Sequence, residues 1–338
     1  MSTTQKHRIY RAKSLNFAIY LAAFFQVTNL QAAQVQITAQ PIEKYQGQAI
    51  GGKVGDLIWR GGLDLEGPEL FGGISGLTFL ENNNWIMISD RGQFFSGQLL
   101  YENGSPAEMI NTQIAPIRNS SGNPLPYNYS RDAEGLETVY RNSRPVAVRV
   151  SFENLTRVAD FSISNSRPVG AAKEVPIPHW LSDVRTNQSI ESVCVAPTAS
   201  PIAGSTLLIT EKFLNDEGNH SGWLVGKRDR GDISLSRQRG FSPTDCAFLP
   251  DGDLLVLERG TGFFTFTMQV RKIAANDVSP GANMVGEVIL EGSGSDIDNM
   301  EALAIRTAGD GSTRMVIMSD DNFNDWERTL LLEFELPE

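Results

Sequence analysis

Histidine and cysteine are scarce in this sequence of 338 residues, and each shortage excludes a kind of site. Of the three histidines, only His179 and His220 lie beyond the first 33 residues, so we expect no zinc centre built from several histidines. Two cysteines, Cys194 and Cys246, are too few for a disulfide framework. We expect them to be buried free thiols, and a bridge between them in an oxidising compartment is the alternative.

Two hydrolase signatures are also missing. No Gly-x-Ser-x-Gly segment occurs, so the sequence offers no nucleophile elbow for a serine carboxylesterase. The Arg-His-Gly signature of histidine acid phosphatases is absent as well.

Long apolar runs are lacking too: the run at residues 15–27 is too short for a helix that crosses about 30 Å of hydrocarbon. We therefore expect no integral membrane segment.

The first 33 residues have the pattern of a secretory signal. Four basic residues are followed by the apolar run and then by the small residues Ala32 and Ala33. We predict a signal peptide over residues 1–33, cleaved near Ala33, and a secreted or periplasmic location for the single domain of residues 34–338. The alternative is a buried N-terminal helix or a membrane anchor.

The remaining chain is strongly acidic. Loss of the four basic residues of the signal would take the formal net charge from −11 to −15. A surface of this charge repels nucleic acid and attracts cations, so we expect no nucleic-acid partner. We expect a monomer that binds a small ligand.

One short segment recurs five times at intervals of 54 to 59 residues. Each copy begins with a polar or acidic residue and continues as a small, partly apolar strand, and the leading residues are Ser75, Glu134, Glu191, Asp245 and Glu301. A second, more apolar strand follows each copy and ends on an acid: Asp90, Glu153, Glu211, Glu258 and Asp320. Units of about 56 residues with about four short strands predict an all-β fold, a β-propeller of antiparallel blades.

The number of blades follows from the last unit, which shows three strands. Residues 54–62 resemble the segment before the fifth unit, so we expect them to supply its fourth strand and to close the ring. This gives five blades. Six is the alternative, if residues 34–50 form further strands.

Pairing the two strands of each unit brings the leading residues and the terminal acids to one mouth of the propeller. With four-residue turns, Ser75 should face Asp90 and Asp245 should face Glu258, and Glu301 should face Asp320. Crowded carboxylates need protons or a cation. Oxygen ligands without histidine or cysteine favour Ca²⁺, with Mg²⁺ less suited to so wide a ring. The predicted metal ligands are Ser75, Glu134, Glu191, Asp245 and Glu301; the alternative is that these side chains only cap strand ends.

Three terminal acids are each followed by a base: Arg91, Lys212 and Arg259. Such bases beside a cation would bind phosphate oxygens, so we predict that they bind substrate. The alternative is local ion pairing. Asp90 and Glu258 are the predicted general bases.

Several motifs together resemble the phytase-like (esterase-like activity of phytase) family over residues 50 to 336. They are residues 54–63, 71–77 and 88–92, Asp132-Ala-Glu-Gly-Leu-Glu, and Asn299-Met-Glu-Ala-Leu. The resemblance implies hydrolysis of phosphoesters or esters. A more distant similarity is to five-bladed calcium-dependent apyrases, whose axial Ca²⁺ is held by a Ser/Glu ring; Ser75, Glu134, Glu191 and Glu301 match it, and Asp245 stands where that pattern has a serine.

The sequence thus leaves three functions open. The first is an exported Ca²⁺-dependent hydrolase of phosphate esters or anhydrides, with a small phosphorylated substrate. The second is a non-enzymatic propeller that calcium stabilises and that binds a ligand or partner protein. The third is a carboxylesterase.

Overall fold

The computed structural model describes residues 32–186, 188–262 and 265–337. The predicted signal peptide, residues 1–33, lies outside these ranges except for its last two residues. Within the described ranges, no helix is both long and apolar enough to span a membrane.

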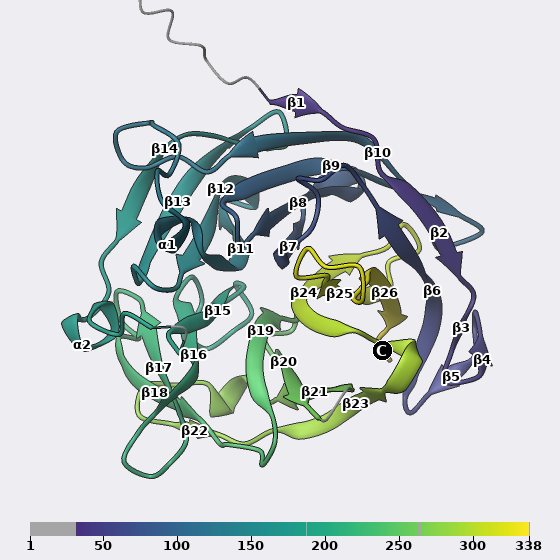
Figure 1. Ribbon diagram of the computed structural model, residues 1–338. Coiled ribbons are helices and arrows are strands. Elements are labelled where there is room, and N and C mark those ends of the chain that lie inside the picture. Colours follow the sequence, from purple (N-terminus) through teal and green to yellow (C-terminus); the bar gives the residue numbers. More distant parts are fainter. Residues whose placement is uncertain (1–31, 187, 263–264, 338) are drawn as a thin grey trace, which may run out of the picture. The chain divides into compact units, whose positions relative to one another are not determined.

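Five antiparallel sheets stand around a common axis, with one strand of each sheet innermost (Figure 1). This confirms the predicted all-β propeller of five blades. The innermost strands are β7 (Ile74–Phe79), β11 (Ala133–Arg141), β15 (Ile190–Val195), β19 (Ser242–Phe248) and β24 (Asn299–Thr307).

In blades 1 to 4 the outer strands follow in chain order, except for β22 of blade 3. Blade 1 continues with β8 (Asn84–Ser89), β9 (Gln93–Glu102) and β10 (Ser105–Pro116), and blade 2 with β12 (Arg144–Phe152), β13 (Arg157–Ser164) and β14 (Arg167–Val175). Blade 3 contains β16 (Thr206–Leu214), β17 (His220–Val225), β18 (Gly231–Leu235) and the short parallel β22 (Asn283–Met284). Blade 4 contains β20 (Leu254–Thr261), β21 (Phe266–Ile273) and β23 (Glu287–Ser293).

Blade 5 combines the two ends of the described chain. β25 (Thr313–Asp320) and β26 (Thr329–Glu335) come from the C-terminal part, and β6 (Leu57–Glu66) from the N-terminal part pairs antiparallel with β26. This strand overlaps the residues expected to close the ring. Beyond it, β2 (Thr38–Ile42) pairs with β6, whereas β1 (Ala33–Gln34) pairs with β10 of blade 1. Residues 33–42 therefore span the seam between the first and last blades.

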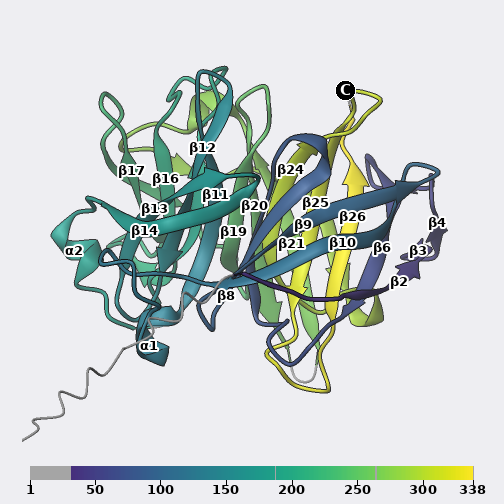
Figure 2. The same cartoon turned by 90° about the horizontal axis from the view of Figure 1, so that it is seen from above.

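The remaining elements are short. β3 (Lys44–Tyr45) and β4 (Gln48–Ala49) form a small hairpin, and β5 (Lys53–Val54) pairs with β6. The α-helical turns α1 (Asn128–Arg131) and α2 (His179–Ser182) have four residues each. Figure 2 shows α1 at one end of the blades.

The core consists of apolar clusters between neighbouring blades. In β8, Trp85 and Met87 pack toward blade 5, whereas Ile86 and Ile88 pack toward blade 2. Both faces of a blade are thus covered, which explains why the second strands are continuous apolar runs rather than alternating ones. Because the space between the blades is filled by these five apolar clusters, polar side chains gather at the ends of the inner strands.

The expectation of two free thiols is wrong. Cys194 in β15 and Cys246 in β19 form a disulfide with a Cα–Cα distance of 5.8 Å, inside the cluster between blades 3 and 4. The two innermost strands lie side by side, so cysteines 52 positions apart in the sequence face each other. Sequence spacing alone does not give this distance.

Candidate functional site

Each innermost strand begins with a β-bulge. The register with the second strand shifts between Ile74/Gly76, Ala133/Leu136, Ile190/Ser192, Pro243/Asp245 and Met300/Ala302. A bulge places an extra residue in one strand and redirects its side chain, and bulges are frequent beside functional sites. The residues at this position, hereafter the inner ring, are Ser75, Glu134, Glu191, Thr244 and Glu301.

The fourth member of the inner ring is therefore Thr244, not the predicted Asp245. The Ser75 hydroxyl donates a hydrogen bond to the carbonyl of Ala133, and the Thr244 hydroxyl donates to the carbonyl of Met300 at 3.2 Å. Ala133 and Met300 each precede the ring residue of the following blade, so the two hydroxyls occupy equivalent places.

Asp245 makes different contacts. Its carboxylate accepts hydrogen bonds from the backbone N–H of Cys246 and from that of Leu303 in blade 5, both at 2.8 Å. Burial raises the pKa of Asp245 well above its usual range, although both hydrogen bonds act in the opposite direction. The side chain ties two inner strands together rather than pointing into the ring.

The predicted pairing of the leading residues with the terminal acids is also wrong, because the turns of blades 1 and 4 have five residues instead of four and the bulges add a further shift. The backbone N–H of Asp90 donates to the carbonyl of Gly73 at 3.1 Å, and in blade 4 Ser242 faces Arg259. Asn299, not Glu301, faces Asp320. The residues at this position, hereafter the outer ring, are Asp90, Glu153, Glu211, Arg259 and Asp320. Blade 4 thus contributes a base where the other blades contribute an acid.

Glu258 lies inside blade 4 instead. It is fully buried, and its two carboxylate oxygens accept hydrogen bonds from Arg271 at 2.6 and 2.7 Å and from Gln269 at 2.6 Å. A carboxylate held in a bidentate ion pair away from the mouth is not available as a general base. Its role is therefore within the blade, and the predicted role as a base is not retained.

The acids of the inner ring influence one another's pKa. Burial raises the pKa of Glu134 well above its usual range, and the charges of Glu191 and Asp132 raise it further. Burial likewise raises the pKa of Glu191, with the charge of Glu153 next in importance. Burial raises the pKa of Glu301 to about 7 even though Arg259 opposes the shift. Since like charges at close range disfavour ionisation, these carboxyls face a common space that favours protons or a cation.

Arg259 is a counter-charge of the two rings. Its guanidinium donates hydrogen bonds to Asn299 and Glu301 and lies 3.7 Å from a carboxylate oxygen of Glu211. Lys212 extends toward solvent, with 52% of its side chain exposed, and pairs with Glu211 at 2.6 Å. Both predicted substrate-binding residues therefore already have carboxylate partners.

One cluster has the ligands of a cation site. Carboxylate oxygens of Asp132, Glu134 and Glu153 all lie within 4.8 Å of one another. Asp132 precedes the bulge of β11 and accepts a hydrogen bond from the Asn154 amide. An all-oxygen set of this kind fits a hard divalent ion such as Ca²⁺ or Mg²⁺. Sequence reasoning missed Asp132, although it opens the motif Asp132-Ala-Glu.

A pocket of about 410 Å³ adjoins this cluster. Asp90, Asp132 and Asn154 line it together with Arg91 and with Asn128, Tyr129 and Arg131 from α1. Burial raises the pKa of Asp90 to about 6, and the charge of Asp132 adds to the shift. One buried carboxylate oxygen of Asp90, Oδ1, has no hydrogen-bond partner among the described residues.

Two bases in this pocket differ from Lys212 and Arg259. Arg91 lies over the ring of Phe323, 3.2 Å from its centroid, and the Nε of Arg131 donates to the carbonyl of Leu125 at 2.8 Å. Within the described ranges, neither guanidinium forms a salt bridge. The predicted Arg91 and the unpredicted Arg131 are thus placed to bind an anionic group.

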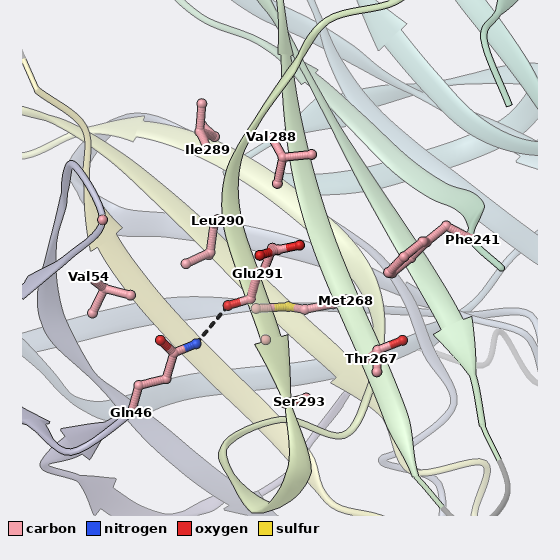
Figure 3. A pocket seen from close by; sticks show the side chains of 12 residues that line it. Gln46, Val54, Phe241, Thr267, Met268, Val288, Ile289, Leu290, Glu291 and Ser293 are labelled. Carbon is pink, nitrogen blue, oxygen red and sulfur yellow. Dashed lines mark hydrogen bonds between the residues drawn. The ribbon is translucent and has the colours of Figure 1, made fainter. Parts of the chain in front are cut away.

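A larger pocket lies elsewhere. Its volume is about 650 Å³, and its lining includes β23 and the N-terminal residues Gln46 and Val54. The Gln46 amide donates a hydrogen bond to the carbonyl of Glu291 at 2.7 Å (Figure 3). The pocket contains no residue of the inner or outer ring. Among the described residues, its lining has one acid and no base, so it offers no positive charge for a phosphate.

Comparisons with known proteins give a family and a general architecture. The family model described as "Phytase-like: Esterase-like activity of phytase" matches residues 69–323. A comparison with curated proteins finds no match.

Solved structures similar to the chain include a glucose dehydrogenase, which is 10% identical with a TM-score of 0.45 over 77% of this chain and 96% of that one. A PQQ-bound aldose sugar dehydrogenase from Streptomyces coelicolor is 11% identical, with a TM-score of 0.41 over 88% and 99% of the two chains. A thermostable family-43 glycoside hydrolase is 9% identical, with a TM-score of 0.46 over 80% and 91%. Similarities this low carry no argument about activity.

Proposed function

The chain belongs to the phytase-like family, and from this premise we propose that it is an exported, calcium-dependent hydrolase of phosphate esters or anhydrides. One observation carries the proposal. Two guanidinium groups that have no salt-bridge partner among the described residues, Arg91 and Arg131, line the same pocket as Asp90 and Asp132 of the cation cluster. Bases for a phosphate, a poised carboxylate and oxygen ligands are the components that such a hydrolysis needs.

Asp132, Glu134 and Glu153 are the residues that would hold the cation, and the bound ion would supply positive charge against the charge that develops on a phosphoryl oxygen. The inner-ring residues Glu191 and Glu301 lie close enough to influence the pKa of Glu134, so they add to the negative field at this place. The alternative to a cation is protonation of these carboxyls.

Asp90 is the candidate general base. Its carboxylate, which lines the pocket, accepts a proton from water while the water oxygen forms a bond to phosphorus, and the bond from phosphorus to the alcohol oxygen breaks. The alcohol takes its proton from solvent. A pKa of about 6 leaves Asp90 largely ionised at neutral pH and still close to the range in which a base is effective.

Arg91 and Arg131 are the candidate phosphate ligands. The guanidinium of Arg91 lies against Phe323, so its orientation is fixed before a ligand arrives. A planar guanidinium can donate two parallel hydrogen bonds to a phosphoryl group, which a lysine ammonium cannot do. This arrangement favours Arg91 and Arg131 over Lys212.

Export is consistent with the disulfide, because such bonds persist in oxidising compartments. The signal peptide, its cleavage near Ala33 and the monomeric state remain part of the proposal. The expected partner is a small phosphorylated substrate.

The function is tested by phosphate release from purified protein that begins at residue 34, with calcium and with a chelator. We expect aryl phosphates or nucleotides to be hydrolysed and the chelator to stop the reaction reversibly. Short aryl esters serve as the comparison for the third function. Chelator-resistant ester cleavage without phosphate release would refute the proposal.

Asp90→Asn tests the assigned base. We expect a fall in kcat of about 10²- to 10⁴-fold, the range typical for loss of a general base. In the unaltered protein, kcat/KM should rise with pH through a value at or below about 6, since the ionised form of Asp90 is required and a nearby cation favours that form. The control is Glu217→Gln, an exposed acid in blade 3. If active Asp90→Asn protein still showed this rise of kcat/KM with pH, the rise would belong to the titration of another group.

The second function, a non-enzymatic propeller stabilised by calcium, has one observation in its favour. The inner ring takes one residue from each blade, so an ion held there would connect several blades. Absence of turnover on every phosphate ester, together with a calcium-dependent rise in melting temperature, would select this function.

A further inference from the structure

Two tyrosines beside the pocket lie side by side and face solvent. The rings of Tyr127 and Tyr129 are 5.5 Å apart between centroids and nearly parallel, at 5°. Tyr127 is 59% and Tyr129 is 56% exposed, although large aromatic side chains usually gain most from burial. Tyr129 belongs to the lining of the pocket that contains Asp90 and Arg91.

The local backbone holds both rings in this position. Ser130 donates from its backbone N–H and its hydroxyl to the carbonyl of Tyr127, at 2.9 and 2.8 Å. Arg157 donates to the carbonyl of Ser130 at 2.7 Å, and Arg131 to that of Leu125. The turn that carries the tyrosines is thus fixed on both sides, so their exposure does not require a mobile loop.

No other aromatic ring of the described residues lines this pocket. Phe323 lies nearby, but the guanidinium of Arg91 covers its face. The ring of Tyr129 is the aromatic surface left for a ligand, and Tyr127 supports it from one side. Flat rings gain from offset stacking on such a surface, beyond the burial of apolar area.

The charges of the pocket limit the number of phosphates. Arg91 and Arg131 are its bases, and Asp90 and Asp132 are its acids. A single phosphoryl group can be bound by the bases and the cation, whereas further phosphates would meet carboxylates. The pocket therefore combines one site for a phosphoryl group, at Arg91 and Arg131, with one aromatic surface for stacking, at Tyr129.

We propose that Tyr129, backed by Tyr127, is a specificity-determining residue that stacks on a flat aromatic ring in the alcohol part of the substrate. The preferred substrates are monophosphate esters of aromatic alcohols rather than polyphosphorylated or saturated ones. This inference rests on the proposed function, because the phosphate position is the one assigned above.

The test compares two esters that differ in flatness, and the change of their rate ratio in Tyr129→Ala separates stacking from the small difference in leaving-group acidity. Benzyl phosphate and cyclohexylmethyl phosphate release alcohols of similar acidity, and the cyclohexyl ring cannot stack. We expect the unaltered protein to prefer benzyl phosphate several-fold in kcat/KM. Tyr129→Ala should lower kcat/KM for benzyl phosphate about tenfold and bring the ratio toward one, as loss of a stacking side chain does elsewhere.

Two further variants separate stacking from a general structural effect. Tyr129→Phe keeps the ring and should keep the preference. Tyr140→Ala removes a tyrosine that is also exposed but lines a different pocket, and it should leave both rates as they are. A preference that survives Tyr129→Ala, or equal rates on both esters in the unaltered protein, would overturn the inference while leaving the hydrolase intact.

Binding supplies the same comparison if neither ester is hydrolysed. Calorimetry with benzylphosphonate and cyclohexylmethylphosphonate, in the presence of calcium, measures the preference without turnover. Tighter binding of benzylphosphonate that Tyr129→Ala abolishes would support the stacking position although the hydrolase had failed. Equal affinity for the two phosphonates would refute the stacking position as well.

Discussion

Asp245 and Glu134 are both acids near the start of innermost strands, but Asp245 is buried and Glu134 half-buried, and their surroundings differ. Asp245 has a hydrogen bond to each carboxylate oxygen from a backbone N–H, and burial raises its pKa. Glu134 has Asp132 and Glu153 beside it, with oxygens within 4.8 Å. The carboxyl of Asp245 thus belongs to the hydrogen-bond network between two blades, whereas that of Glu134 belongs to a group of carboxylates that favours a cation.

These differences predict opposite effects on calcium binding. Glu134→Gln removes a charged ligand and should weaken calcium binding at least about tenfold. Asp245→Asn should leave the affinity within about twofold, since Asp245 belongs to no ring. The measurement is calorimetric titration with calcium. Equal losses in both variants would restore Asp245 to the ring and contradict its replacement by Thr244.

At the scale of single elements, the number of blades could be predicted from the sequence, but the β-bulges at the start of the innermost strands could not. Five evenly spaced segments were enough to predict five blades, because apolar strands and turn residues repeat regardless of local register. The bulge is a backbone feature with no residue signature here. In blade 4 the turn is also one residue longer than the four that the sequence suggests, so a register without turn and bulge assigns the acids Asp245 and Glu258 to the positions of Thr244 and Arg259.

The turn at α1 was missed for a different reason. Arg131 and Asp132 lie before the repeat of blade 2, in a segment without strand pattern, and only the fold brings them to Asp90. A hydroxyl at the equivalent position in blade 1, Ser75, was the available clue that the fourth ring residue could be the hydroxyl of Thr244.

The disulfide between β15 and β19 gives a prediction about stability. Replacing Cys194 and Cys246 together by alanine should lower the free energy of unfolding by about 2–4 kcal/mol, mainly because the unfolded chain loses a constraint. Denaturant titration measures the change. A reductant should destabilise the unaltered protein by a similar amount and the double variant not at all; equal sensitivity of both would show that the bond does not contribute.

At the scale of the whole molecule, the two rings make the stability depend on pH. Burial raises the pKa of Glu153 and of Glu301 to about 7. Without a cation, the folded state therefore binds protons that the unfolded chain has already released. This contribution is complete below the usual glutamate pKa of about 4.5 and is lost as pH rises through about 7.

Calcium replaces those protons, so its stabilising effect should increase with pH. We expect calcium to raise the melting temperature more at pH 8 than at pH 5, by several degrees. Comparing chelator and calcium at each pH cancels the contributions of groups that do not respond to the ion. Scanning calorimetry measures the difference, and an equal calcium effect at both pH values would contradict coupling between ion and protons.

The pairing of β6 with β26 has a consequence for synthesis and quality control. The last blade needs residues from both ends of the described chain, and the inner ring needs a side chain from every blade. A chain truncated before residue 299 would lack Glu301 and the strand β26, so one edge of β6 would lose its partner in the blade. Incomplete molecules would therefore keep an open strand edge that proteases can reach, whereas the closed ring covers it.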